Sequence, residues 1–446
     1  MTDKNKDPAD GSNLKKILGV GFGIAVTIGG TIGVGILRTP GMVAAQLGNR
    51  WLIISAWVIG GIYALLGTIS VIELGTMIPK AGGWYVFVRR AFGDYGGFII
   101  GWSDWIATCA SLASIAIAIG EFFVILFPEL SVFIKTIAIL IILLFVFIQW
   151  IGLKSSSGTQ QLTTLIKAIA FLVLVAACFI WGGKISTGVI STVKTPSTIT
   201  AVFFAFVIAL QSIIFTYDGW YSAVYFTEED KNPGKNLPLS ALGGVLATIV
   251  IYLLVNTGLL YVLPVSKLAK SVAPATDAAI TLFGTKGGQI ITVLSIAALI
   301  SILNAVLLIA TRIIYGLGRD KLFTTKITSV SKSGTPRTAL LLCTIFVIIL
   351  IATGTFEILI AISAFFYVAN YFAGFSALFI LRKKEPQLPR PFKTWGYPWT
   401  TLIFLIGSFI FLIGDIIGDP LNALFALAYV ILSIPAFIWI RKLNLS

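Results

Sequence analysis

The chain has 446 residues, of which 57% are hydrophobic and only 11% are charged, and its mean hydropathy is +0.98. Soluble globular proteins carry about 25% charged residues, so this composition excludes a soluble globule and indicates an integral membrane protein. The net charge of +14 does not indicate nucleic-acid binding, because the basic residues are scattered through short loops. The apolar runs exceed the roughly ten alternating residues of a membrane β-barrel strand, so helices are expected.

Twelve long apolar stretches follow one another, and each predicts a transmembrane helix. They lie near residues 17–45, 51–78, 95–127, 132–151, 162–182, 201–226, 239–263, 287–318, 338–353, 357–381, 399–416 and 421–440. An even number of spans places both termini on one side of the bilayer. Most lysines and arginines outside the spans fall on that same side, so the positive-inside rule predicts that both termini are cytoplasmic.

The polar segments between and beyond the spans are short. We expect 1–16 to be a cytoplasmic tail without a cleavable signal, 382–398 a cytoplasmic loop and 441–446 a second cytoplasmic tail. The chain has no histidine and no acidic pair with metal-site spacing, phosphate loop or nucleophile elbow, so we predict no enzyme activity, metal site or cofactor. The three cysteines fall within predicted spans and are interpreted as packing residues.

The first span contains the glycine-rich run GGTIGVGI, from Gly29 to Ile36. As one helix, the apolar stretch from Leu14 to Val43 would be about 45 Å long, which exceeds a hydrocarbon core of about 30 Å. We therefore expect the helix to unwind at the glycines, although they would also suit close helix packing. The freed groups would be carboxylate-binding amides near Gly33, Val34 and Gly35, and carbonyls near Thr31 and Ile32 that face a cation.

The sixth span is interrupted by TYDGWY, from Thr216 to Tyr221. We expect one half-helix to end with free carbonyls at Phe215, Thr216 and Asp218, and a second to begin at Gly219. An unpaired backbone group in hydrocarbon costs several kcal/mol, roughly, so such a break is expected only where it lines a cavity. Paired breaks in two halves of a transporter mark its substrate site, which here would bind a zwitterion through backbone atoms.

The positions of the two breaks also predict an internal repeat. Five spans precede the second break, and an odd number of spans inverts the second unit relative to the first. We therefore expect two five-helix repeats, 17–182 and 201–381, related by a pseudo-twofold axis in the membrane plane, with two additional helices in 399–440.

Five segments carry a family resemblance across almost the whole chain. They are IGGTIGVGILRTPG, ELGTMIPKAGGWYVFVRRAFG, YDGWYSAVYFTEEDKNPGKNLP, RIIYGLGRDKLF and LRKKEPQLPRPFKTWGYP. With them the chain resembles the amino acid–polyamine–organocation superfamily, and within it the L-type amino acid transporters. The resemblance implies an all-α, LeuT-like fold of twelve helices with five-plus-five inverted repeats, and sodium-independent transport or exchange of amino acids.

The resemblance also implies roles for individual residues. It places the substrate's carboxylate on the amides of Val34 and Gly35. It places the amino group on the carbonyls of Ile32, Phe215 and Asp218, with the Phe215 ring closing the site as a gate. The substrate-binding residues predicted from both arguments are Ile32, Gly33, Val34, Gly35, Phe215, Thr216, Asp218, Gly219 and Tyr221.

Two positions depart from the family pattern. Val34 stands where members often have serine, and Tyr221 stands where asparagine is common. Both departures concern the substrate's side chain more than the class of substrate.

Lys167 is the most informative charge because it lies inside the fifth span. A lysine at the membrane centre costs about 2.5–3.5 kcal/mol on insertion scales, so a role is expected. The resemblance places it beside the unwound first helix, where sodium-coupled relatives of the fold hold a cation. We expect its ammonium to replace that cation at carbonyls near Gly29 to Ile32, with possible proton coupling; the alternative is a lysine that snorkels from a helix end.

Other charged residues have two interpretations each. Glu73, Asp104 and Glu121 are either pathway residues or structural partners of neighbouring helices. Asp218 either contacts a cationic substrate or bonds to the local backbone as an Asx turn. A last group, Arg319, Asp320 and Lys321, either closes an inner gate with Glu228, Glu229 or Asp230 or, as we favour from sequence, consists of solvated loop charges.

Together these observations predict a secondary transporter of neutral amino acids, an exchanger or proton-coupled, that works by alternating access in a prokaryotic inner membrane. A transporter of cationic amino acids or polyamines is the closest alternative, and a channel or a substrate sensor is the alternative of another class. The expected partners are the amino acid and the bilayer, with no nucleic acid, and the protein is expected as a monomer or weak homo-oligomer. Animal family members can pair with a heavy subunit through a cysteine between the third and fourth spans, which residues 128–131 lack, so no such disulfide is expected.

Overall fold

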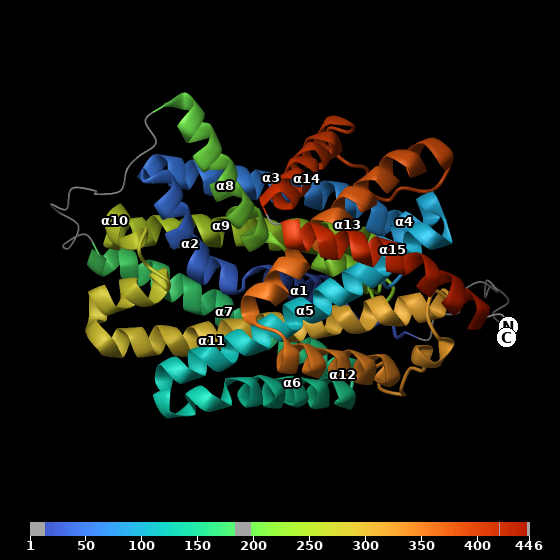
Figure 1. The fold of residues 1–446 in the computed structure, drawn as a ribbon, viewed down its shortest axis with the longest axis horizontal. Coiled ribbons are helices and arrows are strands. Elements are labelled where there is room, and N and C mark those ends of the chain that lie inside the picture. The colour runs from blue at the N-terminus through green and yellow to red at the C-terminus, as the bar shows by residue number, and fades with distance from the viewer. Residues whose placement is uncertain (1–13, 183–197, 419, 444–446) are drawn as a thin grey trace.

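The computed structural model describes residues 14–182, 198–418 and 420–443, and the regular structure of these residues is helical throughout (Figure 1). The elements are α1 (Val20–Thr31), α2 (Val34–Leu47), α3 (Arg50–Met77), α4 (Trp84–Phe92), α5 (Asp94–Leu126), η1 (Pro128–Phe133), α6 (Ile134–Ile151), α7 (Leu153–Trp181), α8 (Ile199–Tyr217), η3 (Ser222–Phe226), α9 (Pro233–Val262), α10 (Val265–Leu268), α11 (Pro274–Arg319), η4 (Thr325–Thr328), α12 (Arg337–Thr353), α13 (Phe356–Lys384), α14 (Trp399–Gly418) and α15 (Pro420–Leu443).

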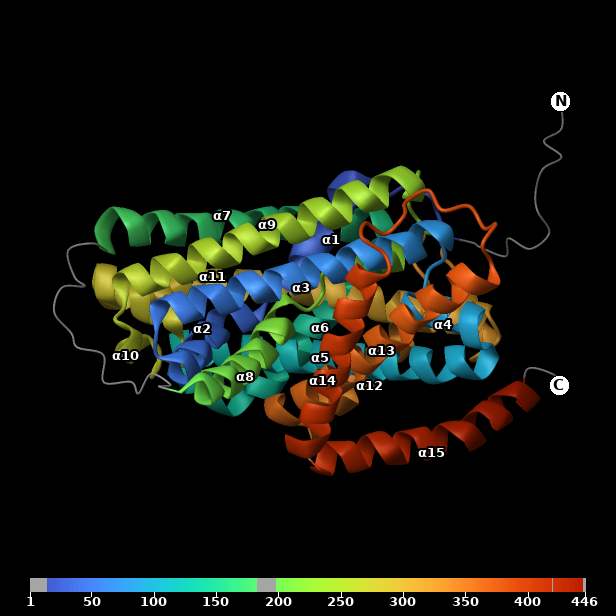
Figure 2. The same ribbon diagram turned by 90° about the horizontal axis from the view of Figure 1, so that it is seen from above.

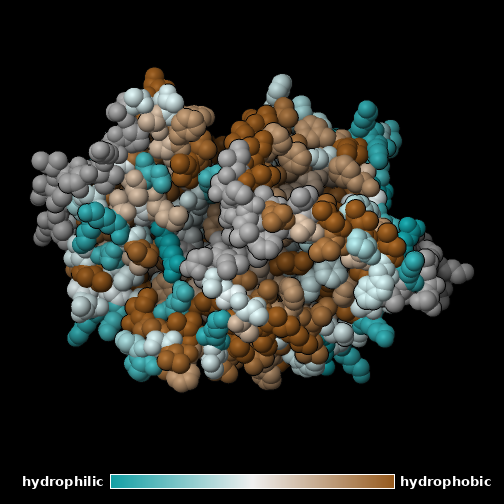
Figure 3. All heavy atoms as spheres, viewed as in Figure 1, coloured by the Kyte–Doolittle hydropathy of each residue, from teal (hydrophilic) through white to brown (hydrophobic). Residues whose placement is uncertain are grey.

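The helices have the length and composition of membrane spans. Among the described residues, eight helices are long and apolar enough to cross a bilayer, or nine if α1 and α2 form one bent span with 44° between their axes. On the face in Figure 3, hydrophobic residues dominate the middle and hydrophilic residues gather mostly toward the two ends. Large exposed apolar side chains such as Phe147, Leu165 and Ile345 suit contact with lipid. The protein is therefore a multi-pass membrane protein.

Three helices begin well before the apolar stretches that predicted them. The helix α7 begins at Leu153, α9 at Pro233 and α11 at Pro274, whereas the stretches begin near 162, 239 and 287. Apolar content marks the part of a helix in hydrocarbon, while proline at the first turn marks the start of the helix itself, as in α9 and α11. Within α11, Gly284 has a φ of 69°, so the helix is interrupted there.

The helices form a bundle whose middle is occupied by α5 and α11. Figure 2 shows α7 and α9 along one edge of the bundle and α15 along the opposite edge. Glycines permit close packing around α5 and α11: a Cβ atom on Gly101 would lie 2.5 Å from the Leu317 side chain, and one on Gly316 would lie 2.5 Å from the Tyr85 hydroxyl. Close contacts of this kind are typical of helix interfaces in membranes.

Both breaks lie inside this bundle and touch each other. A Cβ on Gly219 would lie 2.4 Å from the carbonyl oxygen of Gly30, and a Cβ on Gly30 would lie 2.4 Å from the Ser222 hydroxyl. Only residues without side chains allow two backbones to approach so closely. The two interrupted helices therefore meet backbone to backbone.

Candidate functional site

The first break lies between α1 and α2. Ile32 is extended, with φ −76° and ψ 101°, and Gly33 is the N-cap of α2. The first amides of a helix have no partner within it, so those of Val34 and Gly35 are available to an anion. A Cβ on Gly35 would lie 2.8 Å from the Thr216 side chain, so this glycine lets α2 begin against the end of α8.

The second break follows α8 and differs from the sequence prediction. Asp218 is extended, with ψ 146°, and Gly219 has a φ of 100°, which a helix cannot accommodate. The expectation of a second helix beginning at Gly219 was therefore wrong. The segment resumes at Ser222 as the short 3-10 helix η3.

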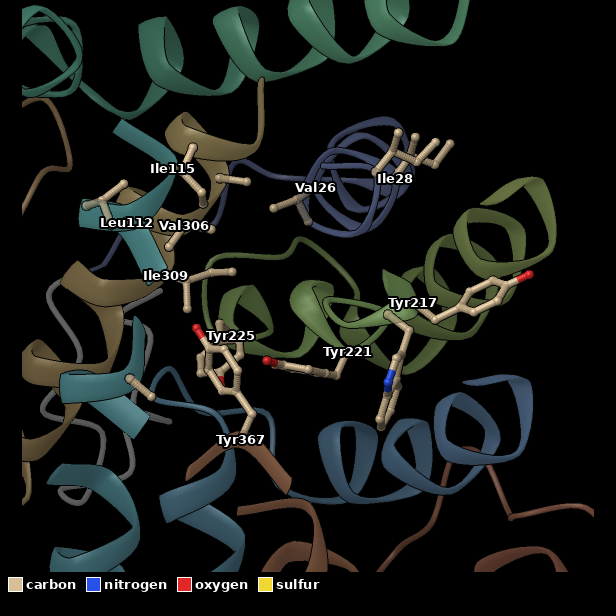
Figure 4. Packing of buried hydrophobic residues seen from close by; sticks show 14 of the residues in the cluster. Val26, Ile28, Leu112, Ile115, Tyr217, Tyr221, Tyr225, Val306, Ile309 and Tyr367 are labelled. Carbon is tan, nitrogen blue, oxygen red and sulfur yellow. The ribbon is translucent and has the colours of Figure 1, made fainter. Parts of the chain in front are cut away.

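A cavity of about 80 Å³ lies between the two breaks. It is lined by seven of the nine predicted substrate-binding residues, namely Gly33, Gly35, Phe215, Thr216, Asp218, Gly219 and Tyr221. Of the other two, Ile32 is buried, and Val34 is the first residue of α2. Figure 4 shows Tyr221, Tyr225 and Tyr367 together, with Val306 and Ile309 beside them and α1 across the gap.

Gly30, Thr31 and Ser222 at the breaks also line the cavity, and its remaining residues come from three helices that the sequence analysis did not assign to the site. These residues are Thr108, Ser111, Ser114 and Ile115 on α5, Ile302, Val306 and Ile309 on α11, and Ser363 and Tyr367 on α13. The hydroxyl residues of α5 are spaced three apart and therefore share one helix face. That spacing is the signal that could have revealed this wall.

Lys167 contacts the carbonyls at the first break. It is fully buried, and its ammonium donates to the carbonyl oxygens of Gly29 at 3.0 Å and Ile32 at 2.5 Å. This position contradicts the alternative of a lysine that snorkels to the membrane surface. One turn earlier on α7, the Thr164 hydroxyl donates to the Ala25 carbonyl at 3.0 Å. The helix α7 thus holds the broken end of α1.

Tyr252 on α9 joins the two breaks and was missed by sequence reasoning. Its hydroxyl lies 2.9 Å from the carbonyl oxygen of Thr31 and 3.0 Å from that of Thr216. The side chain is fully buried, and its ring lies 4.9 Å from that of Tyr217. A single hydroxyl donor is therefore shared by a carbonyl from each interrupted helix.

Two carboxylates near the cavity, the buried Asp104 and the half-buried Asp218, have no ion-pair partner among the residues that the structure describes. Asp218 faces the cavity and accepts a hydrogen bond from the Tyr371 hydroxyl. Asp104 lies one turn from Thr108 on α5 and accepts from the Tyr225 hydroxyl at 2.7 Å. The two remaining acidic residues of uncertain role have structural partners: Glu73 binds Arg382 at 2.8 Å, and Glu121 lies 3.4 Å from Arg38.

A network of ion pairs closes one end of the bundle. Glu229 binds Arg312 at 3.0 and 2.9 Å, with both side chains buried. Glu228 binds Arg319, and Asp320 binds Arg89 at 2.9 Å. The expectation that Arg319 and Asp320 are solvated loop charges was therefore wrong, because the fold brings partners from α4 and the η3–α9 connection against the end of α11.

The charge state of Asp320 follows from this packing. Burial alone would raise its pKa, but Arg319 and Arg89 together bring the pKa below the ordinary value of an aspartate. Asp320 is therefore ionised at neutral pH.

Comparisons with known proteins decide the family of the chain. The family model described as amino acid permease matches residues 23–437. The chain belongs to the amino acid permease family. A serine/threonine exchanger, SteT, from Bacillus subtilis (strain 168) is 30% identical, covering 98% of this chain and 99% of the relative. A b(0,+)-type amino acid transporter 1 from Mus musculus is 28% identical, covering 92% and 84%. A human cystine/glutamate transporter is 24% identical, covering 98% and 89%.

This permease is therefore a membrane transporter of amino acids and not an enzyme. It belongs to the amino acid–polyamine–organocation superfamily and resembles the L-type transporters, as the sequence motifs predicted. Its relatives include exchangers, which supports amino acid exchange.

Proposed function

We propose that this permease is a sodium-independent exchanger of neutral amino acids that binds its substrate between the two breaks. The observation that carries the proposal is the contact of Lys167 with the carbonyls of Gly29 and Ile32. In transporters with broken helices, unwound carbonyls of this kind coordinate the coupling sodium ion or proton. A lysine ammonium at these carbonyls supplies the positive charge without sodium.

The substrate's two charged groups would be bound mainly by backbone atoms. The carboxylate would accept hydrogen bonds from the amides of Val34 and Gly35 at the start of α2. The ammonium would donate to the carbonyls of Ile32, Phe215 and Asp218; the Ile32 oxygen retains a second lone pair beside Lys167. Phe215, which lines the cavity from the end of α8, would cover the substrate as a gate.

The proposal includes the topology predicted from sequence. Twelve spans would form inverted repeats 17–182 and 201–381 and two further helices in 399–440, with cytoplasmic segments 1–16, 382–398 and 441–446. The interruptions after α1 and α8 support the repeat, because they occupy the corresponding place in each half. We also propose an inner-membrane location, a monomer or weak homo-oligomer, and no disulfide to a heavy subunit, since all three cysteines are free and buried.

One observation favours a second candidate, the transport of cationic amino acids. The Asp218 carboxylate faces the cavity, and the two side chains that hydrogen-bond to it, Tyr371 and Tyr221, are neutral. Asp218 is half-buried, and a partly desolvated carboxylate without a counter-charge would favour a cationic substrate side chain there.

The test is exchange of labelled alanine in proteoliposomes, with and without sodium and with a panel of competing amino acids. We expect uptake to require an internal amino acid, to be independent of sodium, and to be inhibited by neutral amino acids. Strict dependence on sodium, or uptake without saturation, would contradict the proposal. Stronger inhibition by lysine or arginine, abolished in Asp218→Asn, would instead establish the second candidate.

A further inference from the structure

Asp104 is a buried carboxylate that the proposed substrate site does not use. It lies on α5 next to the cavity, since Thr108, one turn further along, lines the cavity wall and donates to the Asp104 carbonyl at 2.6 Å. Its side chain is fully buried. One carboxylate oxygen accepts from the Tyr225 hydroxyl at 2.7 Å, and the other from the Asn370 amide at 3.4 Å.

The groups around Asp104 supply no positive charge. In the described part of the chain it forms no ion pair. Four titratable groups interact with it. They are Tyr221, just before η3, Tyr225 on η3, Tyr367 on α13, and Asp218 after α8. The arginines of α4 and of the C-terminal half of α11 form ion pairs with other carboxylates. These pairs join Arg89 to Asp94 and Asp320, Arg90 to Glu385, Arg312 to Glu229 and Arg319 to Glu228.

The strongest partner of Asp104 belongs to a different structural unit. Tyr225 lies on η3, beyond the second break, whereas Asp104 lies on α5 in the middle of the bundle. Tyr225 also fills the space above Gly83, where a Cβ atom would lie 2.0 Å from its ring. Figure 4 shows it close to Tyr221 and Tyr367, which line the cavity, and its ring lies 5.8 Å from that of Tyr221. Tyr225 also lies only three residues before Glu228 of the ion-pair network.

Movement of η3 would change the surroundings of Asp104 in two ways at once. The carboxylate would lose the hydrogen bond from Tyr225, and because that bond stabilises the ionised form, its loss favours protonation. The same movement would open a path for protons from the side of the ion-pair network. An ionised carboxylate without counter-charge at this depth is costly, and proton uptake removes that cost.

We propose that Asp104 is a proton-binding site, filled from the cytoplasmic side when Tyr225 withdraws, so that internal acid favours the inward-open state of the exchanger. The proposal rests on the proposed function for the exchange itself and on the proposed topology for the side. Exchange is expected to accelerate as internal pH falls, because protonation stabilises the state in which η3 has moved.

The ion-pair network does not provide the same response. The pKa of Asp320 lies below the ordinary value of an aspartate, so Asp320 stays ionised throughout the neutral range. The buried Lys167 and the half-buried Asp218 also lie near the cavity, and their variants separate their effects from that of Asp104.

The experiment measures alanine exchange in proteoliposomes while internal pH is varied between about 5.5 and 8 at fixed external pH. We expect wild-type exchange to rise about fivefold or more toward acid, and Asp104→Asn to change by less than about twofold. Tyr225→Phe keeps the carboxylate and removes its donor, so its profile should shift toward higher pH. Tyr63→Phe, which removes a half-buried hydroxyl that bonds to Ser408, is the matched control and should follow the wild type.

Several outcomes overturn the proposal. A wild-type rate that is independent of internal pH, or an Asp104→Asn profile like that of the wild type, removes Asp104 as the proton site. Should Asp104→Asn fail to fold, an unshifted Tyr225→Phe profile has the same meaning. If Lys167→Ala or Asp218→Asn alone flattens the profile, the proton site lies there. Absence of alanine exchange in the wild type at every pH would refute the proposed function instead.

Discussion

At the scale of single residues, the site depends on donors that satisfy carbonyls freed by the breaks. The Lys167 ammonium donates to the carbonyls of Gly29 and Ile32. The Tyr252 hydroxyl is shared by the carbonyls of Thr31 and Thr216. Within a membrane such carbonyls have no water to replace these donors. The helices can therefore stay interrupted only while each donor is present. Removing one should therefore affect transport more than a similar change elsewhere.

Lys167→Ala should reduce alanine exchange by about tenfold or more, because a hydrogen bond to a charged group is worth about 1.5–3 kcal/mol. The measurement is initial exchange rate in proteoliposomes at equal protein content. Lys135→Ala is the matched control, since the Lys135 ammonium also donates to a carbonyl, that of Ala352 at 2.8 Å, but at an exposed position. Equal rates in the two variants would remove Lys167 from the mechanism.

Tyr252→Phe should raise the KM for amino acid by about threefold to tenfold, because one neutral hydrogen bond contributes about 0.5–1.5 kcal/mol. The reason is that the carbonyls of Thr31 and Thr216 lose the donor that sets their separation. Tyr63→Phe is again the control, and both variants should unfold at similar temperatures. A change of thermal stability with unchanged KM would indicate a purely structural role for Tyr252.

Sequence reasoning identified some of these residues and missed others for a physical reason. Lys167 was identifiable because a charge within an apolar stretch is costly, and the glycines of the first break because they allow unwinding. Tyr252 gave no such signal, since a tyrosine in an apolar helix is common and its bonding to two carbonyls depends on the tertiary structure. Asp104 was identified as a charge within a span. Its hydrogen bond to Tyr225 was not predictable, because the two residues are 121 positions apart in the sequence.

At the scale of elements, the locations of both breaks were predictable but their geometry was not. Glycine and polar residues inside an apolar stretch mark where a helix ends, as α1 does at Thr31 and α8 at Tyr217. The form of the continuing segment is set by packing, so α2 is an α-helix whereas η3 is a 3-10 helix. Contact between the breaks, at Gly30 and Gly219, lies beyond what local sequence can specify.

Gly219→Ala should impair both stability and exchange. Its φ of 100° is unfavourable for a residue with a side chain by about 1–2 kcal/mol, and its Cβ would lie 2.4 Å from the Gly30 oxygen. The measurements are the unfolding temperature in detergent and the exchange rate, which should fall by about tenfold or more.

The matched control for this substitution is Gly158→Ala. Gly158 lies within α7 and has no atom within 4 Å of its Cβ position, so alanine should be neutral or stabilising there. A Gly219→Ala variant as stable and active as Gly158→Ala would show that the two breaks do not need their backbone contact.

At the scale of the whole molecule, the ion-pair network joins segments that are distant in sequence. Arg312, about two turns before the end of α11, binds Glu229, and the backbone carbonyl of Glu229 accepts from the Leu18 amide at 3.0 Å. The network thus connects the segment before α1, the connection after η3 and α11. The sequence contained these charges, but their pairing across 83 residues follows only from the fold.

Glu229→Gln should destabilise the permease by about 3–5 kcal/mol, because it leaves the buried Arg312 charge uncompensated. The control is Glu385→Gln, which breaks a pair with the exposed Arg90 and should cost about 0–1 kcal/mol. Unfolding by heat or denaturant in detergent measures both. Equal losses in the two variants would mean that burial does not determine the contribution of these pairs.

The division of the cavity between backbone and side chains has a consequence for altering what the permease carries. In the proposed binding mode, main-chain groups at the two breaks bind the ammonium and carboxylate common to every amino acid. The hydroxyl and aliphatic side chains that α5, α11 and α13 contribute to the cavity would then contact the substrate's side chain. A redesign for another cargo can therefore leave the glycine junction untouched and vary Ser111, Ser114 or Ile309. Selectivity should then change while turnover of the shared zwitterionic portion is retained.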